Sequence, residues 1–196
     1  MTSPVFYILV ALTLTSAMIS VIFFLAWKTL GEKPYALSWS IGFLAATCQW
    51  FFNLASPLFP GFESYWLTVN AFALVLITLG LRGHCQRTNC TVLPQNLWPY
   101  AGAVYAAIVW TTLVDKHVGI STALVPGMAA VTLFFSALMI LRHREKPRPA
   151  EYAAAITMIV FGLAQLAASG MAILQGPVGE ESYRTLYIHF NFLTLP

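Results

Sequence analysis

The chain has 196 residues, of which 59% are hydrophobic and only 9% are charged, and its net charge is +3. Its mean hydropathy is +0.74. A soluble domain of this size needs far more charge to cover its surface, so the composition excludes an ordinary soluble protein and predicts a helical membrane protein. Because a helix needs about 20 apolar residues to cross a bilayer, the length allows roughly seven or eight crossings at most.

Apolar stretches separated by short polar breaks predict an all-α polytopic membrane helix bundle with seven transmembrane helices. In chain order these stretches are residues 4–27, 35–56, 65–81, 97–114, 118–141, 152–175 and 183–196. The last stretch has only 14 residues, which is too short to cross a hydrocarbon core of about 30 Å. The seventh helix is therefore expected to be truncated, and the natural chain is expected to continue past Pro196.

The positions of the basic residues predict an orientation. Eight of the ten Lys and Arg residues fall in the breaks after the first, third and fifth stretches, and they are Lys28, Lys33, Arg82, Arg87, Arg142, Arg144, Lys146 and Arg148. The opposite breaks carry only Lys116 and Arg184. Because basic residues are enriched on the cytoplasmic side of a membrane, we expect the N-terminus outside and the C-terminus in the cytoplasm.

Uncharged polar residues inside the apolar stretches are the candidate ligand-binding residues. They are Gln49, Asn53, Asn70, Gln165, His189 and Asn191. Gln49 and Asn53 are four residues apart and so share one helix face. One interpretation is hydrogen bonding between helices, worth about 0.6 to 2 kcal/mol for each pair. The other is a pocket for a small ligand that arrives from the outer side or from the membrane, because a histidine within a span suggests a functional site.

Motifs that carry catalysis are missing. The sequence has no Gly-rich phosphate loop, no His-Glu-x-x-His zinc motif and no nucleophile elbow, so we predict no catalytic residue, no metal and no cofactor in this chain. Cys85 and Cys90, with His84 nearby, are expected in a reduced cytoplasmic loop with too few ligands for zinc. A shallow metal site remains an alternative, and its ligands would be His117, His189 and Glu180 or Glu181.

Two further patterns bear on helix packing. Pro126 and Gly127 are expected to kink the fifth helix, because proline removes one backbone hydrogen bond. Small residues spaced four apart predict close contact between helices. These pairs are Gly42 with Ala46, and Ala164 with Ala168.

Three short blocks carry a resemblance to a known class of membrane module. They are Trp-Ser-Ile-Gly-Phe at residues 39–43, Gly-Leu-Arg at residues 80–82 and Asn-Phe-Leu-Thr-Leu-Pro at residues 191–196. Over most of its length the chain resembles the N-terminal sensory modules of bacterial GGDEF diguanylate cyclases, and it is also similar to modules that precede histidine kinases. The resemblance implies a dimeric cytoplasmic output domain that binds GTP and Mg and makes cyclic di-GMP.

The chain itself has no Gly-Gly-Asp/Glu-Glu-Phe motif, so these residues are not the cyclase. We therefore expect residues 1–196 to form a single membrane-embedded sensory domain in the bacterial inner membrane, which dimerises and precedes an output domain. No nucleic-acid partner is expected. The alternatives are the sensor of a histidine kinase, or a small stand-alone transporter or membrane enzyme. A transporter is disfavoured because the predicted spans lack charged residues at mid-depth.

Overall fold

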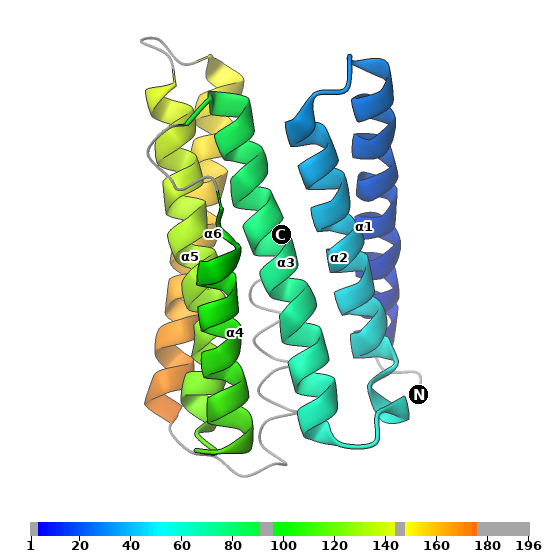
Figure 1. Cartoon of the computed structure of the whole chain (residues 1–196), viewed down its shortest axis with the longest axis vertical. Helices are drawn as coiled ribbons and strands as arrows, with labels where there is room; N and C mark the ends of the chain where they lie inside the picture. The colour runs from blue at the N-terminus through cyan, green and yellow to red at the C-terminus, as the bar shows by residue number, and fades with distance from the viewer. Residues whose placement is uncertain (1–3, 91–95, 144–147, 176–196) are drawn as a thin grey trace. The chain divides into compact units, whose positions relative to one another are not determined.

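The computed structural model describes residues 4–90, 96–143 and 148–175 (Figure 1). Within these ranges all regular structure is helical, as the composition predicts. The elements are α1 Pro4–Thr29, α2 Pro34–Leu54, the 3-10 helix η1 Ser56–Leu58, α3 Phe62–Thr88, α4 Trp98–Leu113, α5 Val118–Arg142 and α6 Pro149–Gln175. Each of the first six predicted stretches corresponds to one α-helix, and the seventh lies outside the described residues.

Four of the described helices, α1, α3, α5 and α6, are long and apolar enough to cross a membrane. The α4 helix has 16 residues, and at 1.5 Å per residue it covers about 24 Å, which is less than the hydrocarbon core of about 30 Å. The α2 helix has 21 residues, but buried polar side chains interrupt its apolar sequence. The four long apolar helices indicate a membrane protein.

Large apolar side chains remain exposed along the long helices. On α1, Leu14 is 60% exposed and Met18 is 65% exposed, and on α6 Val160 is 58% exposed. Surfaces of this kind are unfavourable in water. Lipid tails are as apolar as leucine, so the same surfaces are well solvated in a bilayer. The exposed side chains therefore agree with the composition.

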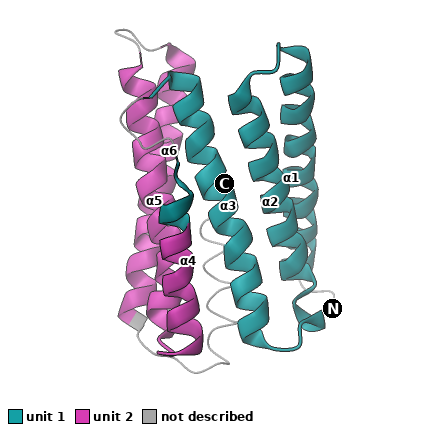
Figure 2. Cartoon of the chain, in the orientation of Figure 1, with its two compact units in different colours: residues 1–101 teal, residues 102–196 magenta. Residues whose placement is uncertain are grey.

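Contacts between helices divide the chain into two compact units, Met1–Ala101 and Gly102–Pro196 (Figure 2). In the first, called unit 1, α2 packs against both α1 and α3. In the second, called unit 2, α5 packs against α6, and the hydroxyls of Thr112 on α4 and Ser121 on α5 lie 3.1 Å apart as a hydrogen-bonded pair. The single sensory domain expected over residues 1–196 stays a prediction.

Two serines join α1 to α2. The Ser20 hydroxyl donates to the Ser40 carbonyl at 2.8 Å, and the Ser40 hydroxyl donates to the Ser20 carbonyl at 2.9 Å. Both residues are buried. Since an unsatisfied polar group inside a bilayer costs several kcal/mol, this reciprocal pairing lets α1 carry serines on its packed face.

Small residues allow α2 and α3 to approach closely. A Cβ added at Gly42 would lie 3.5 Å from the Leu79 Cβ and 3.7 Å from the Leu76 carbonyl oxygen. Ala46, one turn further along α2, is also buried. The close helix contact that the sequence predicts is therefore present at Gly42, between α2 and α3.

The packing of α5 on α6 uses glycine and serine. A Cβ at Gly162 of α6 would lie 2.8 Å from the Phe134 Cε1 atom of α5. The Ser169 hydroxyl of α6 donates to the Ala123 carbonyl at 2.9 Å. That carbonyl lies within one turn of Pro126, which has no N–H to donate to the preceding turn. The α5 helix nevertheless continues through Pro126 to Arg142.

One predicted boundary is wrong. The third apolar stretch ends at residue 81, but α3 continues to Thr88. Arg82 marks the end of the apolar sequence, whereas a helix continues until its backbone changes conformation. That change occurs at Asn89, whose φ of 51° and ψ of 42° are left-handed, a common way to end a helix. Cys85 therefore lies on a helix and not in the predicted loop.

Candidate functional site

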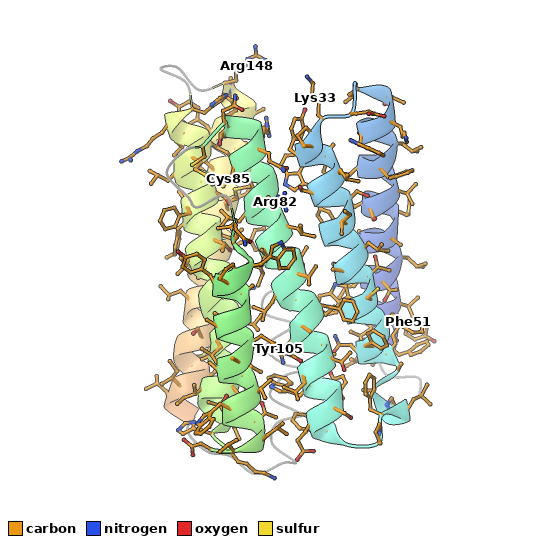
Figure 3. All side chains as sticks on the ribbon, viewed as in Figure 1. Lys33, Phe51, Arg82, Cys85, Tyr105 and Arg148 are labelled. Atoms are coloured by element: carbon orange, nitrogen blue, oxygen red, sulfur yellow. The ribbon has the colours of Figure 1, made fainter. Side chains whose placement is uncertain are left out.

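Three buried carboxamides lie on α2 and α3 in the described part of unit 1. Gln49 and Asn53 of α2 are each 8% exposed, and Asn70 of α3 is 4% exposed. Phe51, between the first two in sequence, lies toward the end of unit 1 opposite Lys33 (Figure 3). These carboxamides are therefore well separated from the basic end of the unit.

A hydrogen bond from Tyr65 connects α3 to this face of α2. The Tyr65 hydroxyl donates to Asn53 Oδ1 at 2.6 Å, and Asn53 Nδ2 donates to the Gln49 carbonyl one turn earlier at 2.9 Å. The Asn53 side chain is thus held by both helices. Its position is fixed in the way expected of a hydrogen bond between membrane helices.

The other two carboxamides keep free hydrogen-bonding groups. Asn70 Nδ2 donates to the Trp66 carbonyl at 2.8 Å, while the Asn70 Oδ1 atom accepts no hydrogen bond from the described residues. The Gln49 side chain makes no hydrogen bond with the described residues, and the residue is 8% exposed. The free amide atoms of Gln49 and Asn70 are not fully buried, so a ligand or a bound water can reach them.

Aromatic rings pack against one another on the same two helices and on the short segment between them. The Phe52 ring lies 5.4 Å from Phe72, and Phe59 lies 5.7 Å from Tyr65. The Trp66 side chain is 1% exposed. The combination of apolar rings with a few amide and phenol groups is typical of a binding site for a small, uncharged polar molecule.

The structure brings together only part of the predicted set. Gln49, Asn53 and Asn70 lie on two packed helices of unit 1. Gln165 is half-buried on α6, in unit 2, so it belongs to a different compact unit. His189 and Asn191 lie outside the described residues. The sequence analysis included Gln165 because it is an uncharged polar residue inside an apolar stretch, as the others are.

Tyr65 is the residue that sequence reasoning did not include in the site. A tyrosine near the end of a span is usually interpreted as an anchor in the lipid headgroup layer. Its hydroxyl instead reaches Asn53. One signal in the sequence could have indicated this bond. Tyr65 follows Asn53 by only twelve residues, and the short connection between them keeps the end of α2 close to the start of α3.

A second group of polar contacts lies near the N-terminal end of α2. The Trp39 Nε1 atom donates to the Gly80 carbonyl at 3.4 Å, and Ser38 Oγ donates to Gln86 Oε1 at 2.8 Å. The Trp39 ring also lies 5.1 Å from the His84 ring. Trp39 and Gly80 belong to two of the blocks that carry the family resemblance, so those blocks meet at one α2–α3 contact.

The metal alternative gains no support from the described residues. Within residues 4–90, 96–143 and 148–175, no group of three His, Cys, Asp or Glu side chains is placed to hold a metal ion. His117 caps the start of α5, where its Nδ1 atom accepts a hydrogen bond from the Ile120 amide at 3.3 Å. The other candidate ligands, Glu180, Glu181 and His189, lie outside the described residues.

Comparison with known proteins identifies no relative of this chain. No family model, no curated protein and no solved structure matches it.

Proposed function

We propose that this chain is the membrane-embedded sensory input of a larger signalling protein, and that a small neutral ligand binds beside the buried carboxamides of unit 1. The observation that carries the proposal is the Gln49 side chain, which makes no hydrogen bond with the described residues although the residue is only 8% exposed. It lies next to Asn53, which α3 holds in place through Tyr65. If the ligand has a higher affinity for one arrangement of these helices than for another, its binding shifts the population toward the arrangement with the higher affinity.

We further propose a bundle of seven helices in a bacterial inner membrane, with the N-terminus outside and the C-terminus in the cytoplasm. Within unit 1, Lys33 and Arg82 lie toward one end and Phe51 toward the other (Figure 3), which agrees with a basic cytoplasmic side. The proposed output is a GGDEF diguanylate cyclase that acts as a dimer and itself binds GTP and Mg. This proposed output rests on the resemblance of the blocks at residues 39–43, 80–82 and 191–196.

The orientation has a direct test. Single cysteines introduced at Asp115 or at Arg148, in a chain without its native cysteines, should react differently with a membrane-impermeant maleimide in intact cells. We expect labelling at Asp115 and protection at Arg148, because the basic breaks face the cytoplasm. Both side chains are exposed, so burial does not explain a difference. Labelling at Arg148 with protection at Asp115 would reverse the proposed orientation.

The sensory role is tested on the complete gene product in membrane vesicles, by following the conversion of GTP to cyclic di-GMP. Gln49→Ala should change the rate by about fivefold or more, the lower range of coupling between two sites. Thr47→Ala is the matched control, because Thr47 lies on the same helix and, among the described residues, its hydroxyl bonds only to the Phe43 carbonyl. We expect this control to retain the normal rate.

Three other outcomes would contradict parts of the proposal. Normal cyclic di-GMP synthesis by Gln49→Ala would remove Gln49 from the sensory site. Autophosphorylation from ATP in place of cyclase activity would retain the sensor and replace the cyclase with a histidine kinase. A complete gene product without either output would favour the stand-alone transporter or enzyme.

A further inference from the structure

The C-terminal end of α3 has a specific backbone geometry. Asn89 is left-handed, with φ 51°, and both its amide and the Cys90 amide donate to the Cys85 carbonyl, the latter at 3.0 Å. The bond from the Cys90 amide is the longer of the two bonds of a Schellman motif, and the bond from the Asn89 amide is that of the simpler αL motif. In the Schellman motif the residues at the positions of Cys85 and Cys90 commonly touch through their side chains.

This chain places a thiol at each of those two positions. An apolar contact frequently lies there, whereas this chain has two cysteines, which the 3.0 Å bond from the Cys90 amide to the Cys85 carbonyl holds close together. Both cysteines are half-buried, and neither is in a disulfide. The third cysteine, Cys48, lies on α2, which has no other cysteine. The backbone at this helix end thus places two thiol-bearing residues next to each other.

We propose that Cys85 and Cys90 form a redox-active dithiol that closes to an intramolecular disulfide by exchange with glutathione disulfide. One cysteine thiolate attacks a sulfur of glutathione disulfide and releases one glutathione. The second cysteine then attacks the mixed disulfide at the protein sulfur and releases the other glutathione. The dithiol loses two electrons and two protons, and one glutathione disulfide becomes two glutathione thiols.

The backbone geometry favours the second step. Because the Cys90 amide already bonds to the Cys85 carbonyl at 3.0 Å, the two residues need little movement to reach the short Cα separation of a disulfide. A thiol on a residue held this close has a high effective concentration, so it should displace glutathione faster than a second glutathione molecule can. The expected product is a small ring that fixes the end of α3.

The test uses the purified chain in lipid nanodiscs, treated with glutathione disulfide, blocked with N-ethylmaleimide and digested with trypsin without reduction. Cleavage after Arg82 and Arg87 separates Cys85 from Cys90, so only a disulfide keeps the two peptides joined. We expect the joined peptides to exceed the glutathione adducts of these two cysteines by about tenfold or more. Predominant glutathione adducts, or chains linked through these cysteines, would overturn the proposal.

Two variants test whether the helix cap causes this preference. Asn89→Gly retains the left-handed conformation and should close as fast as the native chain. Asn89→Val disfavours that conformation, since a β-branched residue rarely adopts positive φ, and should slow closure roughly tenfold. Equal rates for the two variants would show that the cap does not position the thiols. Cys48→Ser is the control for the remaining thiol and should behave like the native chain.

Discussion

Replacing Gly83 by alanine is expected to destabilise unit 1 by about 1 to 3 kcal/mol through overpacking. A Cβ at this position would lie 2.2 Å from the Trp39 Nε1 atom and 2.5 Å from its Cδ1 atom. The indole cannot simply rotate away, because its Nε1 atom bonds to the Gly80 carbonyl and its ring packs against Phe23 and His84. Thermal unfolding in detergent micelles, followed by circular dichroism, measures the loss.

Gly80→Ala is the matched control for this effect. Gly80 lies one turn before Gly83 on the same helix, and a Cβ there would meet nothing within 4 Å. Because alanine is a better helix former than glycine by about 1 kcal/mol, the control should be neutral or stabilised. Combining Gly83→Ala with Trp39→Phe should recover part of the lost stability. Similar unfolding of Gly83→Ala and Gly80→Ala would contradict the packing described here.

Replacing Gly162 by leucine is expected to separate α6 from α5 and to destabilise unit 2 by about 1 to 3 kcal/mol or more. Even a Cβ at Gly162 would lie 2.8 Å from Phe134 Cε1 and 3.0 Å from its Cζ atom, and leucine adds three further carbons. Crosslinking between single cysteines introduced on facing positions of α5 and α6 measures the separation in the membrane.

Gly170→Leu is the control on the same helix. Gly170 is exposed, and a Cβ there would meet nothing within 4 Å, so a leucine at this position adds apolar surface for lipid without displacing α5. Replacing the opposing phenyl ring by a smaller side chain, with Phe134→Leu, should restore part of the α5–α6 crosslinking in the Gly162→Leu variant. Full crosslinking of Gly162→Leu alone would show that the two helices tolerate bulk at this contact.

Much of the fold was predictable because the apolar length needed to cross a membrane is a strong constraint. The stretch at residues 118–141 and the helix Val118–Arg142 nearly coincide. The error at the end of α3 has a simple cause. Charge shows where the apolar sequence ends, whereas the left-handed backbone of Asn89 determines where the helix ends, and one asparagine in a polar segment is a weak signal.

The site was predictable only within a helix. The spacing of Gln49 and Asn53 puts both on one face, and the structure joins them through a hydrogen bond. Contacts between helices depend on how the helices cross and on their relative shift, which the sequence pattern does not determine. This is why the bond from Tyr65 to Asn53 was missed, and why Gln165 was grouped with residues of another unit.

The reciprocal serine pair between α1 and α2 limits the mechanical modes open to unit 1. Sliding α1 along α2 by even one residue, about 1.5 Å, would lengthen both hydrogen bonds of Ser20 and Ser40 together. Two hydrogen bonds therefore oppose the sliding of α1 along α2. The hydrocarbon of the membrane offers no other hydrogen-bonding groups to replace them. Tilting or rotating the two helices as one rigid body leaves both bonds intact, so displacement of α1 in the membrane would carry α2, and with it Gln49 and Asn53.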